Sequence, residues 1–216
     1  MARRRPCAYC GKPGTTKDHV FPRQIYPVSR ASSRVQLLTV PACESCNGSW
    51  SDDEVVFRNV LTLCGETPNE ARKELWASTI QRSFAEADGQ HRIAQLADRM
   101  RAIDVHGQAR TMIFPGKDQS VLRVVRKAIR GLSYHHFMEG CVPDERVWAD
   151  VLLYKVPDHL LPELQHSHRD PEVVEYWFGK KSGYGFTSTW LLTFYRTVTF
   201  IGAVKEEDVQ ARLTSG

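Results

Sequence analysis

Residues 7–10 of the chain read Cys-Ala-Tyr-Cys and residues 43–46 read Cys-Glu-Ser-Cys, and these two stretches decide how the N-terminal part folds. Each carries the Cys-x-x-Cys spacing that fills two corners of a tetrahedral zinc site. The 32 residues between the pairs exclude a small compact finger but suit an ion that joins the two ends of a ββα unit. We therefore expect a structural Zn²⁺ held by four thiolates, those of Cys7, Cys10, Cys43 and Cys46.

The length and composition are those of a soluble globular protein. The chain has 216 residues, of which 42% are hydrophobic and 25% charged, enough for one good domain or a small module and a larger one. No apolar run approaches the length of a membrane span, and no apolar core follows the basic N-terminus as it would in a secretory signal. We expect a cytoplasmic protein with no membrane partner, in which paired cysteines bind metal rather than form disulfides.

Positive charge is concentrated around the paired cysteines. Residues 1–50 contain eight Lys or Arg and two acidic residues, a formal charge of +6, while the other 166 residues sum to −2. This distribution favours a polyanion such as nucleic acid as the partner. A basic surface that is merely solvated is the alternative interpretation.

The remaining patterns predict an α+β fold. Apolar residues at helical spacing, or alternating and aromatic-rich, mark the elements. The expected helices are 46–63, one that opens at 67–70 and carries Trp76, Ile80 and Phe84, 91–103, 118–137 and a short piece near 158–165. The expected strands are 111–114, 148–156, 173–178, 187–194 and 197–204. We divide the chain into a zinc-stapled ββα module, 1–64, and a region of unknown role, 65–216, which has a helical middle (66–137) and a C-terminal antiparallel β-sheet (147–205).

Asp18, His19 and Asn47 lie between or directly after the cysteine pairs, and the zinc site leaves them unused. The stretch 18–22 reads Asp-His-Val-Phe-Pro, and 40–49 reads Val-Pro-Ala-Cys-Glu-Ser-Cys-Asn-Gly-Ser. With the first cysteine pair, this order of residues resembles the HNH endonucleases, the ββα-metal nucleases. The resemblance covers roughly residues 5–60, and no part of the remaining chain resembles a family that we can name.

The resemblance implies a role for each of these three residues. His19 matches the general base that takes a proton from the attacking water, and a neutral imidazole suits that task. Asp18 and Asn47 match the ligands of a catalytic divalent ion, Mg²⁺ or Mn²⁺, which prefers oxygen donors. The implied activity is metal-dependent hydrolysis of DNA phosphodiester bonds. Lys17, Arg23 and Arg34 are the candidate contacts to the nucleic acid.

Two positions depart from the family pattern. The middle Asn of the HNH motif, which orients the loop that carries the base, is Leu38 here; Gln36 or a backbone carbonyl could take over its role. The position four residues after Asn47, a His in some members, is Ser51. A catalytically degenerate, zinc-stapled module that binds nucleic acid or a partner protein is therefore the rival hypothesis, and RNA is the alternative substrate. Cleavage of both DNA strands would need a homodimer or two encounters, and the C-terminal region is available to bind a second copy or a partner protein.

Other polar groups have simpler interpretations. Arg123, Arg126, Lys127 and Arg130 form a basic stripe on the expected helix 118–137, either a solvated outer face or a track for phosphates. His135, His136 and Cys141 do not match a standard metal spacing and are expected to be core or surface residues. We expect Trp50 to pack the helix against the hairpin rather than to stack on a base.

Overall fold

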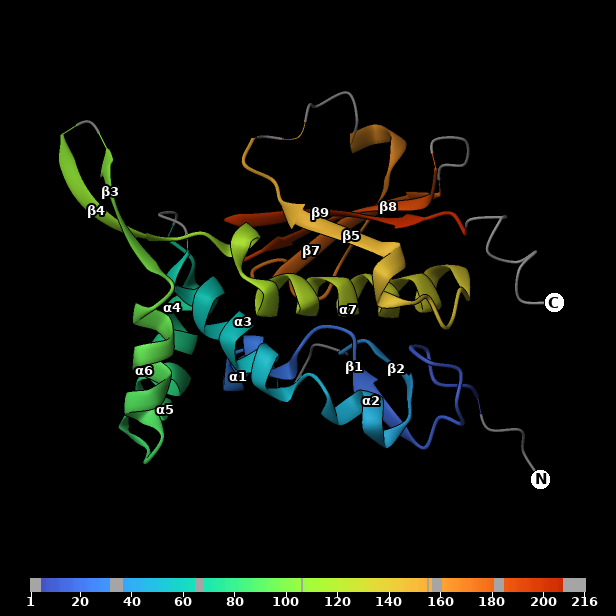
Figure 1. Ribbon diagram of the computed structural model, residues 1–216, viewed down its shortest axis with the longest axis horizontal. Coiled ribbons are helices and arrows are strands. Elements are labelled where there is room, and N and C mark those ends of the chain that lie inside the picture. The colour runs from blue at the N-terminus through green and yellow to red at the C-terminus, as the bar shows by residue number, and fades with distance from the viewer. Residues whose placement is uncertain are drawn as a thin grey trace.

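The computed structural model describes residues 5–31, 37–64, 68–105, 107–154, 156, 161–180 and 185–207. Its main body has three layers: a five-stranded sheet, the long helix α7 (Gln119–Phe137), and an N-terminal layer that contains the cysteines (Figure 1). One cluster of buried apolar side chains runs through all three layers, from Cys7 to Val204. The predicted mixed α+β class is confirmed, and the proposed boundary at residue 64 stays a prediction.

The sheet is antiparallel throughout and has the strand order β5-β9-β8-β7-β6. Its strands are β5 (Val147–Val151), β6 (Gln165–His168), β7 (Val174–Lys180), β8 (Phe186–Phe194) and β9 (Val198–Lys205). Val174, Tyr176 and Phe178 are buried while the residues between them are half-exposed, so β7 turns one face to the core. Phe178 stacks on its cross-strand partner Trp190 with ring centroids 5.4 Å apart.

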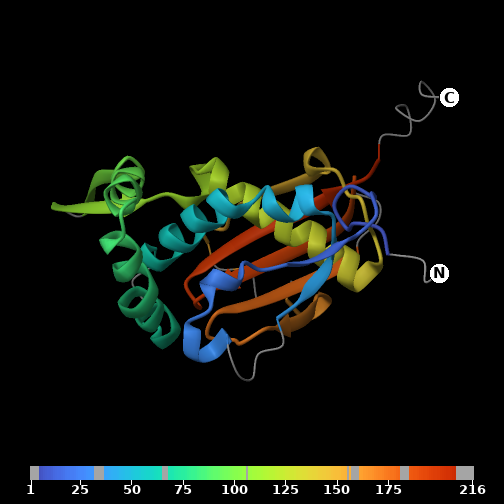
Figure 2. The same ribbon diagram turned by 90° about the horizontal axis from the view of Figure 1, so that it is seen from below.

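Helix α7 lies between the sheet and the N-terminal layer and is buried on both sides (Figures 1 and 2). Its N-cap is Asp118, whose carboxylate accepts hydrogen bonds from the next backbone N–H groups, those of Ser120 and Val121. On each side of α7, a glycine lets the helix lie close to its neighbour. A Cβ at Gly131 would lie 2.9 Å from a Val20 methyl group, and one at Gly202 would overlap the Ile129 side chain. The helix is therefore held tightly from both directions.

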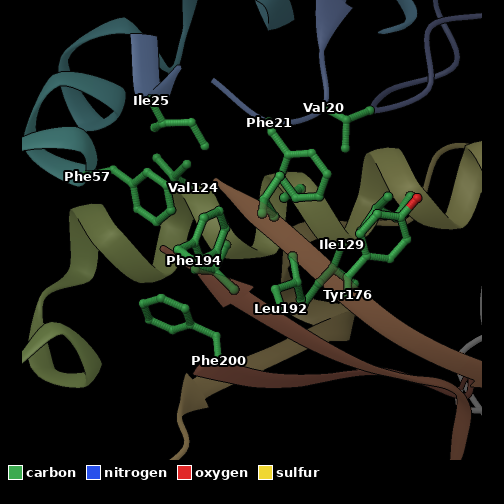
Figure 3. Packing of buried hydrophobic residues seen from close by; sticks show 14 of the residues in the cluster. Val20, Phe21, Ile25, Phe57, Val124, Ile129, Tyr176, Leu192, Phe194 and Phe200 are labelled. Atoms are coloured by element: carbon green, nitrogen blue, oxygen red, sulfur yellow. The ribbon is translucent and has the colours of Figure 1, made fainter. Parts of the chain in front are cut away.

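The N-terminal layer contains a two-stranded hairpin, three α-helices and one 3₁₀ turn. Its elements are β1 (Thr16–His19), the short η1 (Arg23–Ile25) and α1 (Val28–Ala31), β2 (Thr39–Ala42), α2 (Glu44–Gly48) and α3 (Ser51–Leu63). Val20, Phe21 and Ile25, which follow β1, point toward α7 and the sheet (Figure 3). The Phe21 ring lies 6.1 Å from Phe194, edge to face, and the loop after β1 is thereby part of the main core.

A helical arm and a hairpin project from the body on one side (Figure 1). The arm contains α4 (Glu70–Leu75), a π-helical segment η2 (Trp76–Ile80), α5 (Gln81–Ala85) and α6 (Gly89–Ala97). The hairpin pairs β3 (Met100–Val105) with β4 (Gln108–Ile113), and the described side chains of β4 are almost all exposed. Three single 3₁₀ turns complete the fold, η3 (Pro115–Lys117), η4 (Asp144–Arg146) and η5 (Leu161–Glu163).

Several predicted elements are confirmed and others are wrong. Helix 118–137 and the C-terminal strands are present, as is a strand at 111–114. The expected helix 46–63 is two helices, since the chain turns at Ser49 and Trp50. The expected helix 91–103 ends at Ala97, and its last part forms β3 instead because it pairs with β4. The piece near 158–165 contains only a 3₁₀ turn among its described residues, and β6 was missed.

Candidate metal centre and the Asp18–His19 segment

The four paired cysteines come together at one end of the hairpin. Their sulfur atoms all lie within 4.8 Å of one another, and they are the only such group of three or more metal-ligating side chains among the described residues. Cys10 Sγ lies 3.6 Å from Cys43 Sγ, too far for a disulfide. Zn–S bonds of about 2.3 Å in a tetrahedron place sulfurs about 3.8 Å apart. The cluster therefore fits Zn²⁺, as the sequence predicts.

Backbone turns bring each pair of sulfurs together. In the first pair, the Gly11 N–H donates to the Cys7 carbonyl at 3.0 Å, and Gly11 has φ of +75°, which favours glycine. In the second pair, Cys43 is the N-cap of α2, and the Asn47 N–H donates to its carbonyl at 2.9 Å. The Ser45 hydroxyl, 3.2 Å from Cys43 Sγ, is the main cause that lowers the Cys43 pKa to about 6 and favours the thiolate that binds metal.

The strands β1 and β2 place Asp18 and His19 away from the cysteines. In the antiparallel register Asp18 lies opposite Val40 and His19 opposite Thr39. Asn47, on α2, donates its side-chain N–H to the Thr16 hydroxyl at 3.2 Å. Thr16 is two residues before Asp18, on the same side of β1. The hairpin and α2 thus bring the three expected residues into one unit, but no hydrogen bond or ion pair joins Asn47 to Asp18 or His19.

Asp18 is buried, with 5% of its surface exposed, and both carboxylate oxygens have partners. The Tyr9 hydroxyl donates to Oδ2 at 2.7 Å, and Lys127 Nζ lies 3.0 Å from Oδ2 and 3.2 Å from Oδ1. Lys127 also donates to the His19 carbonyl at 2.9 Å and to Glu54 Oε1 at 2.7 Å. A divalent ion on Asp18 would lie beside this ammonium group, so the arrangement does not fit the Mg²⁺ or Mn²⁺ ligand that the resemblance assigns to Asp18.

His19 stands at the end of β1 with its backbone fixed and its ring half-buried. The next N–H, that of Val20, donates to the Leu38 carbonyl at 2.9 Å, so a backbone carbonyl holds the loop where the family pattern has an Asn side chain. No partner of the imidazole is present among the described residues. Burial is the main cause that lowers the His19 pKa below its ordinary value, and the charges of Lys127 and Arg23 lower it further against the opposing effect of Asp18. The ring is therefore neutral at pH 7.

Two of the three candidate nucleic-acid contacts are exposed residues, and the third lies outside the described residues. Lys17 and Arg23 are exposed beside His19, where a phosphate could reach them. Arg34, like Gln36, lies outside the described residues. The basic stripe of α7 is not a solvated face: Lys127 is fully buried and Arg130 is 7% exposed.

The stripe instead fastens α7 to the cysteine-bearing layer. Arg130 donates to the Tyr9 carbonyl at 2.8 Å, and Arg123 pairs with Asp53 at 2.8 Å while its guanidinium lies 4.9 Å from the Trp50 ring centroid. Trp50 is buried, but its ring packs against α7 and the Tyr9 ring rather than against the hairpin as expected. Basic residues at helical spacing form the same sequence pattern whether they face water or carboxylates. The partners of Lys127 could therefore not be predicted from the sequence.

Of the histidines expected to be core or surface residues, His136 is half-buried against the sheet and His135 is exposed. The His136 ring lies 4.0 Å from Phe178, centroid to centroid, and its Nε2 is 3.1 Å from the Tyr176 hydroxyl. Burial, followed by the charges of His135 and Arg169, lowers its pKa to about 4.

Comparison with known proteins adds no relative. No family model matches the chain, and neither the curated proteins nor the solved structures contain a significant match. Among the described residues there is also no helix with the length and apolar character that crossing a membrane requires.

Proposed function

We propose that the chain is an endonuclease that hydrolyses DNA phosphodiester bonds with His19 as general base. The observation that carries the proposal is the state of His19: a half-buried imidazole with a lowered pKa at the end of β1, with no partner among the described residues, in a unit whose cysteine cluster fits zinc. The motif resemblance around Asp18, His19 and Asn47 supports the reaction type. Exposed Lys17 and Arg23 supply positive charge for the substrate backbone.

In this reaction the water oxygen forms a bond to phosphorus while the bond from phosphorus to the 3′ oxygen breaks. His19 accepts the proton of the water, and solvent protonates the leaving 3′ oxygen, so the products carry 5′-phosphate and 3′-hydroxyl ends. A zinc ion held by Cys7, Cys10, Cys43 and Cys46 would take no part in the reaction and would tie the loop before β1 to the start of α2. A monomer with one such site nicks one strand per encounter, and a duplex break requires a dimer or two encounters.

A plasmid-nicking assay with a matched histidine control tests the proposal. General-base catalysis contributes about 10²–10⁴-fold, so His19→Ala should lower the cleavage rate by that factor. His91, exposed on α6, is the control, and His91→Ala should cut like the parent. Parallel reactions on RNA, with and without Mg²⁺ or Mn²⁺, identify the substrate class and the ion requirement. A parent protein that cuts no nucleic acid, or a His19→Ala variant with full activity, refutes the proposal.

The burial of Asp18 favours a second candidate, a zinc-stapled module that binds nucleic acid without cutting it. A carboxylate with both oxygens engaged by Tyr9 and Lys127 serves the fold rather than a reaction. This candidate predicts salt-dependent DNA binding in a gel-shift assay, weakened by Arg23→Gln, with no cleavage product under any ion condition.

A further inference from the structure

We propose that the Lys127 ammonium group is a built-in cation that occupies an oxygen site formed by Asp18, Glu54 and the His19 carbonyl, so that Asp18 binds no divalent metal ion. The inference concerns the segment proposed to be catalytic. Measurements of ion binding and of stability test the inference, and they do not depend on whether the chain cuts DNA.

The oxygen partners match the donors of the ammonium group. A lysine ammonium has three N–H donors and no acceptor. Lys127 Nζ lies 3.0 Å from the Asp18 carboxylate, 2.9 Å from the His19 carbonyl and 2.7 Å from Glu54 Oε1. All three donors therefore have an acceptor, as a lysine with no exposed surface requires. The site encloses the cation as a metal site would.

The partners are also those that a hard divalent ion takes. Two carboxylates and a backbone carbonyl are typical ligands of Mg²⁺, Mn²⁺ or Ca²⁺. The charged groups that face the site are Asp18, Glu54 and Lys127, and Arg130 lies over the Tyr9 ring at 5.4 Å from its centroid. Two carboxylates and one ammonium leave one net negative charge, which the Tyr9 hydroxyl partly offsets by its hydrogen bond to Asp18. A second cation on Asp18 would face the ammonium at close range, a strongly repulsive arrangement.

The backbone of α7 is held close to its neighbours on both sides near Lys127. Gly131 lies one helical turn further along the same face, and a Cβ there would lie 2.9 Å from a Val20 methyl group. On the opposite side Ile129 fills the space above Gly202 of the sheet. The helix backbone is thus fixed close to β1, and the Lys127 side chain is directed into the oxygen site.

The decisive measurement is Mn²⁺ binding to the zinc-loaded wild-type protein, followed by electron paramagnetic resonance. Manganese prefers oxygen donors and leaves the thiolate cluster to zinc. We expect no stoichiometric Mn²⁺ site at millimolar Mn²⁺. One bound equivalent that Asp18→Asn or Glu54→Gln removes overturns the proposal. Bound Mn²⁺ that neither substitution removes lies elsewhere and leaves Asp18 without a metal ion, as proposed.

Two substitutions of Lys127 provide the converse test. Lys127→Ala vacates the oxygen site, and Lys127→Met fills the same volume without charge. Removal of one partner from a buried ion pair should lower the melting temperature of both variants by about 6–20 °C. Only Lys127→Ala should then bind one equivalent of Mn²⁺ and recover part of that loss when the ion is added. An Lys127→Ala variant that folds, retains zinc and gains no Mn²⁺ site contradicts the proposal; if it does not fold, the wild-type titration decides.

Discussion

Replacement of Tyr9 by Phe removes one hydroxyl group from the buried network around Asp18. Tyr9 is 2% exposed, and its hydroxyl donates to the ionised carboxylate at 2.7 Å. A hydrogen bond to a charged group contributes about 1.5–3 kcal/mol to stability. For a chain of this length each kcal/mol shifts the melting temperature by about 2–4 °C. Tyr9→Phe should therefore lower the melting temperature of the zinc-loaded protein by about 3–12 °C.

The matched control is Tyr195→Phe. Tyr195 is 1% exposed and also makes one hydrogen bond through its hydroxyl, but it donates to a neutral acceptor, the Ile25 carbonyl, at 2.6 Å. Such a bond contributes about 0.5–1.5 kcal/mol, so the expected loss is about 1–6 °C. Thermal unfolding followed by circular dichroism gives both melting temperatures under identical conditions. If Tyr195→Phe costs as much as Tyr9→Phe, the buried Asp18 is not the charged centre of a network, and the argument for Lys127 weakens with it.

Three further outcomes are expected. Cys46→Ser should reduce bound zinc, measured by mass spectrometry, from one equivalent to almost none, whereas Cys64→Ser, at a buried cysteine outside the cluster, should retain it. Burial lowers the His19 pKa, so the cleavage rate should fall only when the pH drops through a midpoint below about 6.5. Arg23→Gln removes a positive charge near His19 and should raise the midpoint of this pH profile. A midpoint above about 6.5 for the parent protein contradicts the prediction. The folded-state pKa of His136 is about 4, so the unfolded chain binds the proton first as pH falls below about 6.5. About 2 kcal/mol of stability should therefore be lost between these two pH values, by urea unfolding, and His136→Phe should abolish that pH dependence.

Local signals in the sequence were sufficient for several elements. Helix α7 has apolar residues at helical spacing over its whole length, and the C-terminal strands alternate clearly. The prediction failed where one helical pattern runs on into a second element. Residues 100–103 continue the helical spacing of α6 but belong to β3, which pairs with β4. The short strand β6 has a polar sequence, Gln-His-Ser-His, and is extended only because it pairs with β7.

For the candidate site, the sequence identified the residues of interest but not their burial or their hydrogen-bond partners. Asp18 and His19 were identified by their position between the cysteine pairs, and the hairpin register places them at the end of β1. That Asp18 is buried depends on Tyr9 and on Lys127, which is 109 positions away along the chain. The basic stripe that contains Lys127 was expected to face solvent or phosphate, and half of it is buried against the N-terminal layer.

The sequence by itself identified the four clustered cysteines and the polar residues near them, because the three-residue spacing within each cysteine pair is a local property of the backbone. Only the tertiary structure decided which charges meet. The packing of Gly131 on Val20 and of Ile129 over Gly202 fixes the position of α7, and this position directs the Lys127 ammonium to Asp18, Glu54 and the His19 carbonyl. A buried charge must find its partners in the fold, and these partners can lie anywhere in the chain.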